Sequence, residues 1–104
     1  MNIEKINLEG IDIPVHDFLD KQRSFLTDAS IICGWFHNII NHEHTCSDRF
    51  MDRLQILYSK IYERYLITLW LSDNIVGKQE IQMWMWKILQ DIDAMREHCL
   101  QERA

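Results

Sequence analysis

The chain of 104 residues carries sixteen acidic and eleven basic side chains, which gives a net charge of −5 at neutral pH. Its 47% hydrophobic and 26% charged residues are an ordinary globular composition, so we expect one domain with one hydrophobic core. The negative charge disfavours direct binding to the phosphate backbone of nucleic acids. No apolar run reaches the roughly 18–20 residues that a membrane span requires, so no membrane protein is expected.

The three cysteines, Cys33, Cys46 and Cys99, are an odd number, and no apolar leader with a small-residue cleavage site precedes them. Disulfide frameworks belong mainly to oxidising compartments and use paired cysteines. We therefore expect a cytoplasmic protein with reduced thiols, in which Cys33 and Cys99 are plain buried residues.

Residues 1–15 alternate apolar and polar side chains on either side of Gly10, and this alternation is typical of an extended chain rather than a helix. We expect an acidic extended N-terminal arm at 1–15, followed by a helical bundle domain at 16–104. The arm should steer the protein toward a basic partner protein, because long-range charge complementarity speeds association. The partner-binding carboxylates predicted on the arm are Glu4, Glu9 and Asp12.

Apolar residues at steps of three, four and seven predict long amphipathic helices at 17–41, 48–73 and 78–102. Short connections favour antiparallel neighbours, so the predicted fold is all-α, an antiparallel bundle of three long helices. A break at 27–28 would divide the first helix and give four helices. Gly34 costs about 1 kcal/mol relative to alanine inside a helix, which predicts close approach by a neighbouring backbone or ring.

The second and third helices hold more apolar residues than one core-facing stripe needs. Apolar surface that a monomer leaves uncovered marks an association site, and tryptophan and methionine are enriched in such sites. We expect a homo-oligomer, most simply a two-fold dimer. If the first helix is broken, it could instead cover the surplus within a four-helix monomer. The partner-binding residues predicted on the helices are Trp70, Met83, Trp86 and Leu89.

Trp84 and Trp86 invite comparison with the aromatic platforms that bind nucleotide bases. Two positions apart on a helix, however, they project about 200° from one another. They therefore cannot form one platform, and we expect one in the core and the other at an interface.

Histidines and a cysteine gather around the first connection, at His37, His42, His44 and Cys46. In an up-down-up bundle the end of the third helix returns to this connection, so His98 and Cys99 should lie nearby. Imidazole and thiolate ligands suit zinc. The sequence therefore leaves open a zinc site that draws on several of these side chains, although their spacing matches no established zinc finger. The predicted ligand set is His42, His44, Cys46, His98 and Cys99.

No catalytic constellation is evident, because the three glycines form no phosphate-binding loop and no nucleophile stands beside a base. Asp48 and Asp52 alternate with Arg49 and Arg53, which indicates a solvated face of ion pairs rather than paired catalytic acids. The favoured hypothesis is a non-enzymatic protein-binding module without cofactor. As a small acidic homo-oligomer it would act as an inhibitor, an immunity or antitoxin-type protein, an anti-defence protein or an adaptor. The alternatives are a zinc-type metal-binding protein and a small-ligand sensor with its pocket between protomers.

Overall fold

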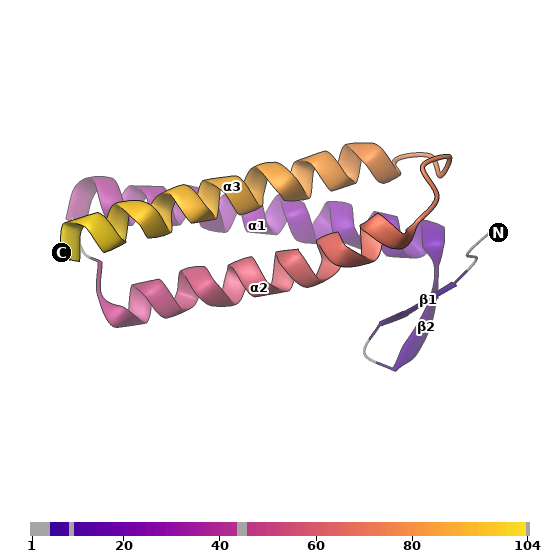
Figure 1. Ribbon diagram of the computed structural model, residues 1–104, viewed down its shortest axis with the longest axis horizontal. Helices are drawn as coiled ribbons and strands as arrows, with labels where there is room; N and C mark the ends of the chain where they lie inside the picture. Colours follow the sequence, from indigo (N-terminus) through magenta and orange to yellow (C-terminus); the bar gives the residue numbers. More distant parts are fainter. Residues whose placement is uncertain (1–4, 9, 44–45, 104) are drawn as a thin grey trace.

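The computed structural model describes residues 5–8, 10–43 and 46–103 and shows three long helices preceded by a short hairpin (Figure 1). The elements in chain order are β1 (Lys5–Leu8), β2 (Ile11–Pro14), α1 (Val15–Glu43), α2 (Asp48–Trp70) and α3 (Lys78–Arg103). Successive helices run in opposite directions, so the end of α3 lies at the same end of the bundle as the end of α1 and the start of α2 (Figure 1). The predicted all-α bundle with an extended N-terminal segment is confirmed. In the described part of the chain, no helix has the length and apolarity to cross a membrane.

The N-terminal segment forms an antiparallel hairpin, in which Ile6 pairs with Ile13 and Leu8 pairs with Ile11. Gly10 adopts a φ of +81° at the turn, a backbone conformation that glycine takes without steric cost. The extended conformation is as predicted, but the pairing of its two halves was not foreseen. Ile6 and Ile13 are buried and belong to the same core as the helices, so the hairpin is packed against the bundle.

Helix α1 begins at Val15, two residues before the predicted start at residue 17. Val15 is buried, and it directly follows Pro14, which has no backbone N–H to leave unsatisfied at a helix start. The predicted break at 27–28 is absent, since α1 runs without interruption from Val15 to Glu43. The Thr27 hydroxyl donates to the backbone oxygen of Arg23 at 2.9 Å, a contact that threonine can make inside a helix. The four-helix alternative is therefore wrong.

The starts of α2 and α3 are as predicted. The side chain of Ser47 accepts a hydrogen bond from the backbone N–H of Phe50 at 3.2 Å, which caps α2. Gly77 precedes α3 with a φ of +85°. Helix α2 ends at Trp70, three residues before the predicted end, because Leu71 turns to an extended conformation and its side chain is buried in the core.

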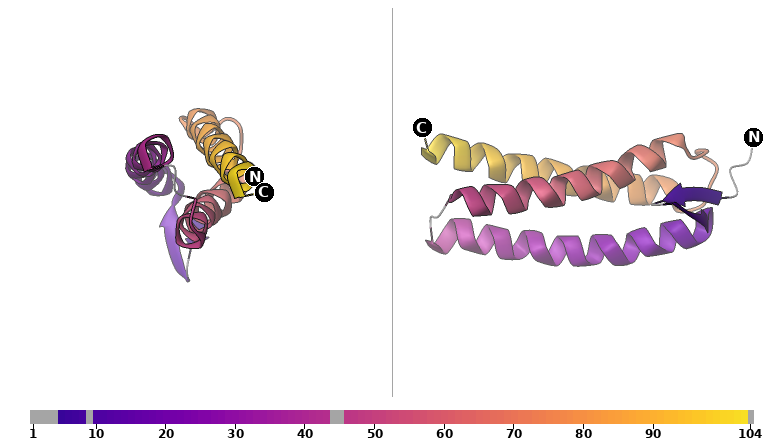
Figure 2. Two further views of the ribbon diagram at one scale, coloured as in Figure 1. Left: turned by 90° about the vertical axis from the view of Figure 1, so that its left-hand side faces the viewer. Right: turned by 90° about the horizontal axis from the view of Figure 1, so that it is seen from below.

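The three helices stand at the corners of a triangle when the bundle is viewed end-on (Figure 2). Helix α3 packs closely along both other helices, whereas α1 and α2 approach each other much less closely. The core is filled by aliphatic, aromatic and sulfur-containing side chains from all three helices. Its fully buried large members include Phe18, Leu26, Leu54, Ile61, Met85 and Ile92.

No neighbouring backbone or ring comes close to Gly34 among the described residues. It is exposed on α1, and a Cβ added there would meet no atom within 4 Å among the neighbours. The expectation of a neighbouring backbone or ring at Gly34 is therefore wrong, and the residue leaves open space on the helix surface.

Candidate protein-binding surface

The bundle presents uncovered apolar side chains along the side where α2 and α3 meet. We call these residues the aromatic surface: Tyr62, Leu66 and Leu69 of α2, with Met83 and Trp86 of α3. All five are exposed, Met83 to 61% and Trp86 to 51% of their surface. The α2 members are separated by four and three residues and the α3 members by three, spacings that place side chains on one helix face.

Aromatic contacts join the two helices beneath this surface. The rings of Tyr65 and Trp86 have centroids 5.9 Å apart and planes tilted by 33°. Along α2, Tyr58 and Tyr62 stack with centroids 5.9 Å apart. Tyr58 and Tyr65 are partly buried against the core, so they hold the exposed members in place from below. Rigid aromatic side chains of this kind lose little conformational entropy when another protein covers them.

The two tryptophans of α3 point to different sides, as predicted. Trp84 is partly buried, and its Nε1 donates to the Ser30 hydroxyl of α1 at 3.3 Å. Trp86 lies on the side of α2, in contact with Tyr65. The pair therefore forms no platform for stacking a base.

The other predicted partner-binding residues differ in how exposed they are. Trp70 is the last residue of α2, 80% exposed, and lies one helical turn beyond Leu66. Leu89 is 2% exposed and packs in the core, so the prediction that it belongs to the uncovered apolar surface is wrong. Around the helix axis Leu89 lies 80° from the buried Ile81. This is close enough to the core-facing stripe for the packing of α2 against α3 to bury it.

Of the carboxylates predicted to bind a partner, Asp12 is exposed on β2 and accepts a hydrogen bond from Asn7 at 3.1 Å. Glu4 and Glu9 lie outside the described residues.

The predicted metal ligands are only partly described, since His44 lies outside the described residues. The end of α1, the start of α2 and the end of α3 do lie at the same end of the bundle (Figure 1). Cys99, however, is fully buried, and the imidazole of His98 lies 3.5 Å from the carboxylate of Glu102 on its own helix. No group of three ligand-type side chains that could hold a metal ion occurs among the described residues.

One cluster of chemically active side chains was missed. His37 Nε2 lies 2.7 Å from the Asp91 carboxylate across the α1–α3 contact, and Cys33 stands one helical turn before His37. The two partners are 54 residues apart in the chain, so no sequence spacing could reveal them. Burial of the Cys33 thiol and, to a smaller extent, the nearby charge of Asp91 together raise its pKa to about 11. Such a thiol stays protonated at neutral pH and is a poor nucleophile.

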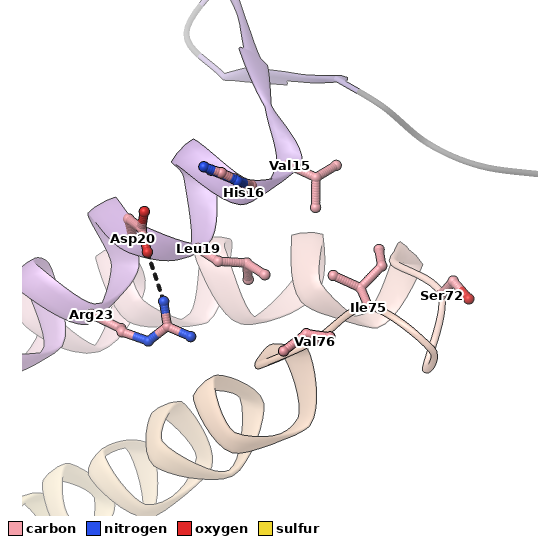
Figure 3. A pocket seen from close by; sticks show the side chains of 8 residues that line it. All are labelled: Val15, His16, Leu19, Asp20, Arg23, Ser72, Ile75 and Val76. Carbon is pink, nitrogen blue, oxygen red and sulfur yellow. Dashed lines mark hydrogen bonds and ion pairs between the residues drawn. The ribbon is translucent and has the colours of Figure 1, made fainter.

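A pocket at the hairpin end of the bundle was also missed (Figure 3). It has a volume of about 500 Å³ and lies between the first turns of α1 and the loop after α2. Val15, Leu19, Ile75 and Val76 form its apolar walls. Arg23 is its basic group, but its guanidinium is already engaged by Asp20 at 2.7 Å, as the dashed line in Figure 3 shows. The pocket is therefore a mixed, open hollow with no convergent set of unpaired charges.

Comparison with family models, with curated proteins and with solved structures gives no match for this chain.

Proposed function

We propose that the chain is a non-enzymatic protein-binding module that forms a two-fold homodimer through the aromatic surface. The observation that carries the proposal is the exposure of Met83 and Trp86 beside three apolar residues of α2. Exposed apolar side chains that gather on adjacent helix faces are typical of protein-association sites. Tryptophan, tyrosine and methionine are also the types that are enriched where proteins bind one another.

The absence of charged residues in the aromatic surface favours a second copy of this chain as the protein that covers it. None of the five members of the aromatic surface is an acidic or basic residue, so in two copies these side chains can face one another without like-charge repulsion despite the net charge of −5. Two charged neighbours on α3, Asp93 and Arg96, are paired with each other at 3.4 Å. An isologous contact between two copies of this patch would bring Trp86 of one protomer onto the partner's apolar side chains.

A dimer that supplies surfaces rather than chemistry acts by covering part of another protein, as inhibitors, immunity proteins, antitoxins and adaptors do. In this proposal the aromatic surface holds the dimer together, and the remaining faces of the bundle are available to a further partner.

Sedimentation equilibrium over a wide range of protein concentrations tests the dimer. The wild-type chain is compared with Trp86→Ala and with Trp35→Ala, a matched variant that removes another exposed indole, from α1. We expect Trp86→Ala to raise the dimer dissociation constant by about 30-fold or more, the effect of losing an interface hot spot. Trp35→Ala should leave the constant unchanged.

Either of two outcomes would reject the proposal. A wild-type chain that sediments as a monomer at every concentration has no dimer to explain. Equal effects of Trp86→Ala and Trp35→Ala would show that the aromatic surface is not the contact.

A further inference from the structure

A second apolar region lies on the side of the bundle where α1 and α2 face one another. It contains a hollow of about 320 Å³ between the two helices, which we call the α1–α2 groove. Trp35 and Ile56 stand on its opposite walls, 63% and 55% exposed. Ile32 and Phe36 of α1 form its floor, and Phe36 is buried. The groove therefore combines a fixed apolar base with two exposed apolar walls.

The groove is open because α1 and α2 are the pair of helices that stand farthest apart. Long side chains span the distance: Phe36 meets the ring of Phe50 edge-on at 5.4 Å, and the guanidinium of Arg64 lies 4.2 Å from the centre of the Phe25 ring. Packed helices usually stand about 8–10 Å apart, with ridges of one filling grooves of the other. A wider pair can leave a hollow between its helices, into which side chains of a further helix can fit.

The charges that line the groove are opposite to the charge of the whole protein. Both ionisable residues at the hollow, Arg53 and Lys60, are cations and stand seven residues apart on α2. Within the described residues, no ion pair joins either of them to a carboxylate. Arg64 lies one helical turn after Lys60 on α2 and adds a third cation on the same side of this helix. In a chain with net charge −5, this is a local basic rim around an apolar channel.

We propose that the α1–α2 groove binds an acidic amphipathic helix of a partner protein. Apolar residues of that helix, spaced three and four apart, would enter between Trp35 and Ile56, while its carboxylates would face Arg53 and Lys60. The fourth helix would complete a four-helix bundle, a stable arrangement for helices that cross at small angles. This inference rests on the proposal that the chain is a protein-binding module, and it names the partner's chemistry; it does not use the aromatic surface.

The proposed partner differs from the basic one expected from the N-terminal acids. Glu4 and Glu9 lie outside the described residues. Asp12 lies on the hairpin, which precedes the start of α1, whereas the residues that line the groove come from the middle of α1 and α2. The hairpin and the groove are therefore separate surfaces. Of the two, the groove is the one that pairs a hollow with charges of a single sign.

The test uses two fluorescein-labelled synthetic helical peptides and the full-length protein. Both peptides carry the same leucine face, and their flanking positions are glutamate in one and lysine in the other. Fluorescence anisotropy at low and at raised salt gives the dissociation constants. We expect the glutamate peptide to bind about tenfold more tightly than the lysine peptide, and the difference to shrink as salt screens the charges.

Variants then locate the site. The double variant Arg53→Gln/Lys60→Gln should weaken binding of the glutamate peptide about tenfold, since two exposed charge contacts of modest strength are lost. The matched control Lys5→Gln/Lys87→Gln removes the same net charge from exposed positions on β1 and α3 and should have little effect. The reversal Arg53→Glu/Lys60→Glu should transfer the preference to the lysine peptide. Trp35→Ala should weaken both peptides.

Three results would overturn the inference. The first is equal binding of the two peptides, or no binding of either. The second is equal loss in the groove variant and its control. The third is dissociation of the wild-type dimer by Trp35→Ala but not by Trp86→Ala, which would assign the groove to a second copy of this chain. Peptide binding that persists in a monomeric Trp86→Ala variant would support the groove independently of the dimer.

Discussion

Tyr65 of α2 and Trp86 of α3 lie with ring centroids 5.9 Å apart, and this contact closes the junction of the two helices while half of the indole stays exposed. Trp86 therefore has two roles that different variants can separate. Its inner edge packs within the chain, and its outer edge is free to contact another protein. Buried and exposed apolar residues on α3 should therefore respond differently to truncation.

The first prediction compares Leu89→Ala with Met83→Ala, two apolar truncations on one helix. Leu89 is buried, so its truncation should lower the free energy of unfolding by about 2–5 kcal/mol. Met83 is exposed in the single chain, so Met83→Ala should change it by about 0.5 kcal/mol or less when measured in dilute solution. Urea denaturation of both variants gives the values. Similar losses in the two variants would contradict the placement of these side chains.

The second prediction concerns the glycines. Gly34→Ala should stabilise the protein by about 0.5–1 kcal/mol, because alanine is the better helix former and the added Cβ meets open space. Gly77→Ala is the matched opposite case. Its φ of +85° is unfavourable for alanine, and the new Cβ would press against the guanidinium of Arg23, so a loss of about 1 kcal/mol or more is expected.

Thermal unfolding of the two glycine variants supplies the readout. A melting temperature that rises for Gly34→Ala and falls for Gly77→Ala agrees with the structure. A fall for Gly34→Ala would mean that a neighbour does approach this position.

The third prediction is a loss of stability at alkaline pH that depends on Cys33. Burial raises the pKa of this thiol from 9.0 to about 11 in the folded chain, so the folded state holds the proton more tightly than the unfolded state. Below pH 9 both states are protonated and the full stability is present. As the pH rises from about 9 to 11, the unfolded thiol ionises first, and about 2 kcal/mol of stability should be lost.

Denaturant unfolding of wild type and Cys33→Ala across this pH range isolates the contribution of the thiol, because all other titrating groups are shared. The wild-type curve should fall more steeply than that of the variant between pH 9 and 11. Parallel curves would show that Cys33 does not carry a raised pKa.

The fourth prediction addresses the zinc alternative. Because Cys99 is buried and His98 neighbours Glu102, we expect protein purified without a histidine tag to keep the same melting temperature after treatment with a chelator. Elemental analysis should find less than stoichiometric zinc. Stoichiometric zinc whose removal lowers the melting temperature would restore the metal-binding hypothesis, since structural zinc contributes directly to folding.

Much of the fold was predictable because each helix carries its own signals. Ser47 caps α2 and the apolar stripes have helical spacing, so the three helices and their antiparallel order followed from local chemistry. The pairing of Ile6 with Ile13 was less accessible, since alternation predicts an extended chain but does not identify its neighbour. The end of α2 was misplaced because the burial of Leu71, a tertiary contact, overrides its helix propensity.

The candidate surfaces were predictable only in part. Helical angles separated Trp84 from Trp86 correctly, because the angle between two residues on one helix depends on sequence alone. They could not place Leu89, whose burial depends on how closely α2 packs against α3. The α1–α2 groove also required the structure, since its opening arises from the unequal spacing of the three helices.

The most direct test of the central proposal is hydroxyl-radical footprinting of the wild-type chain from dilute to concentrated solution, read by mass spectrometry residue by residue. If the aromatic surface holds a homodimer together, oxidation of Met83 and Trp86 should fall several-fold as the concentration rises through the dimer dissociation constant, while that of Trp35 should stay constant. Unchanged oxidation of Met83 and Trp86 at every concentration would contradict the proposal.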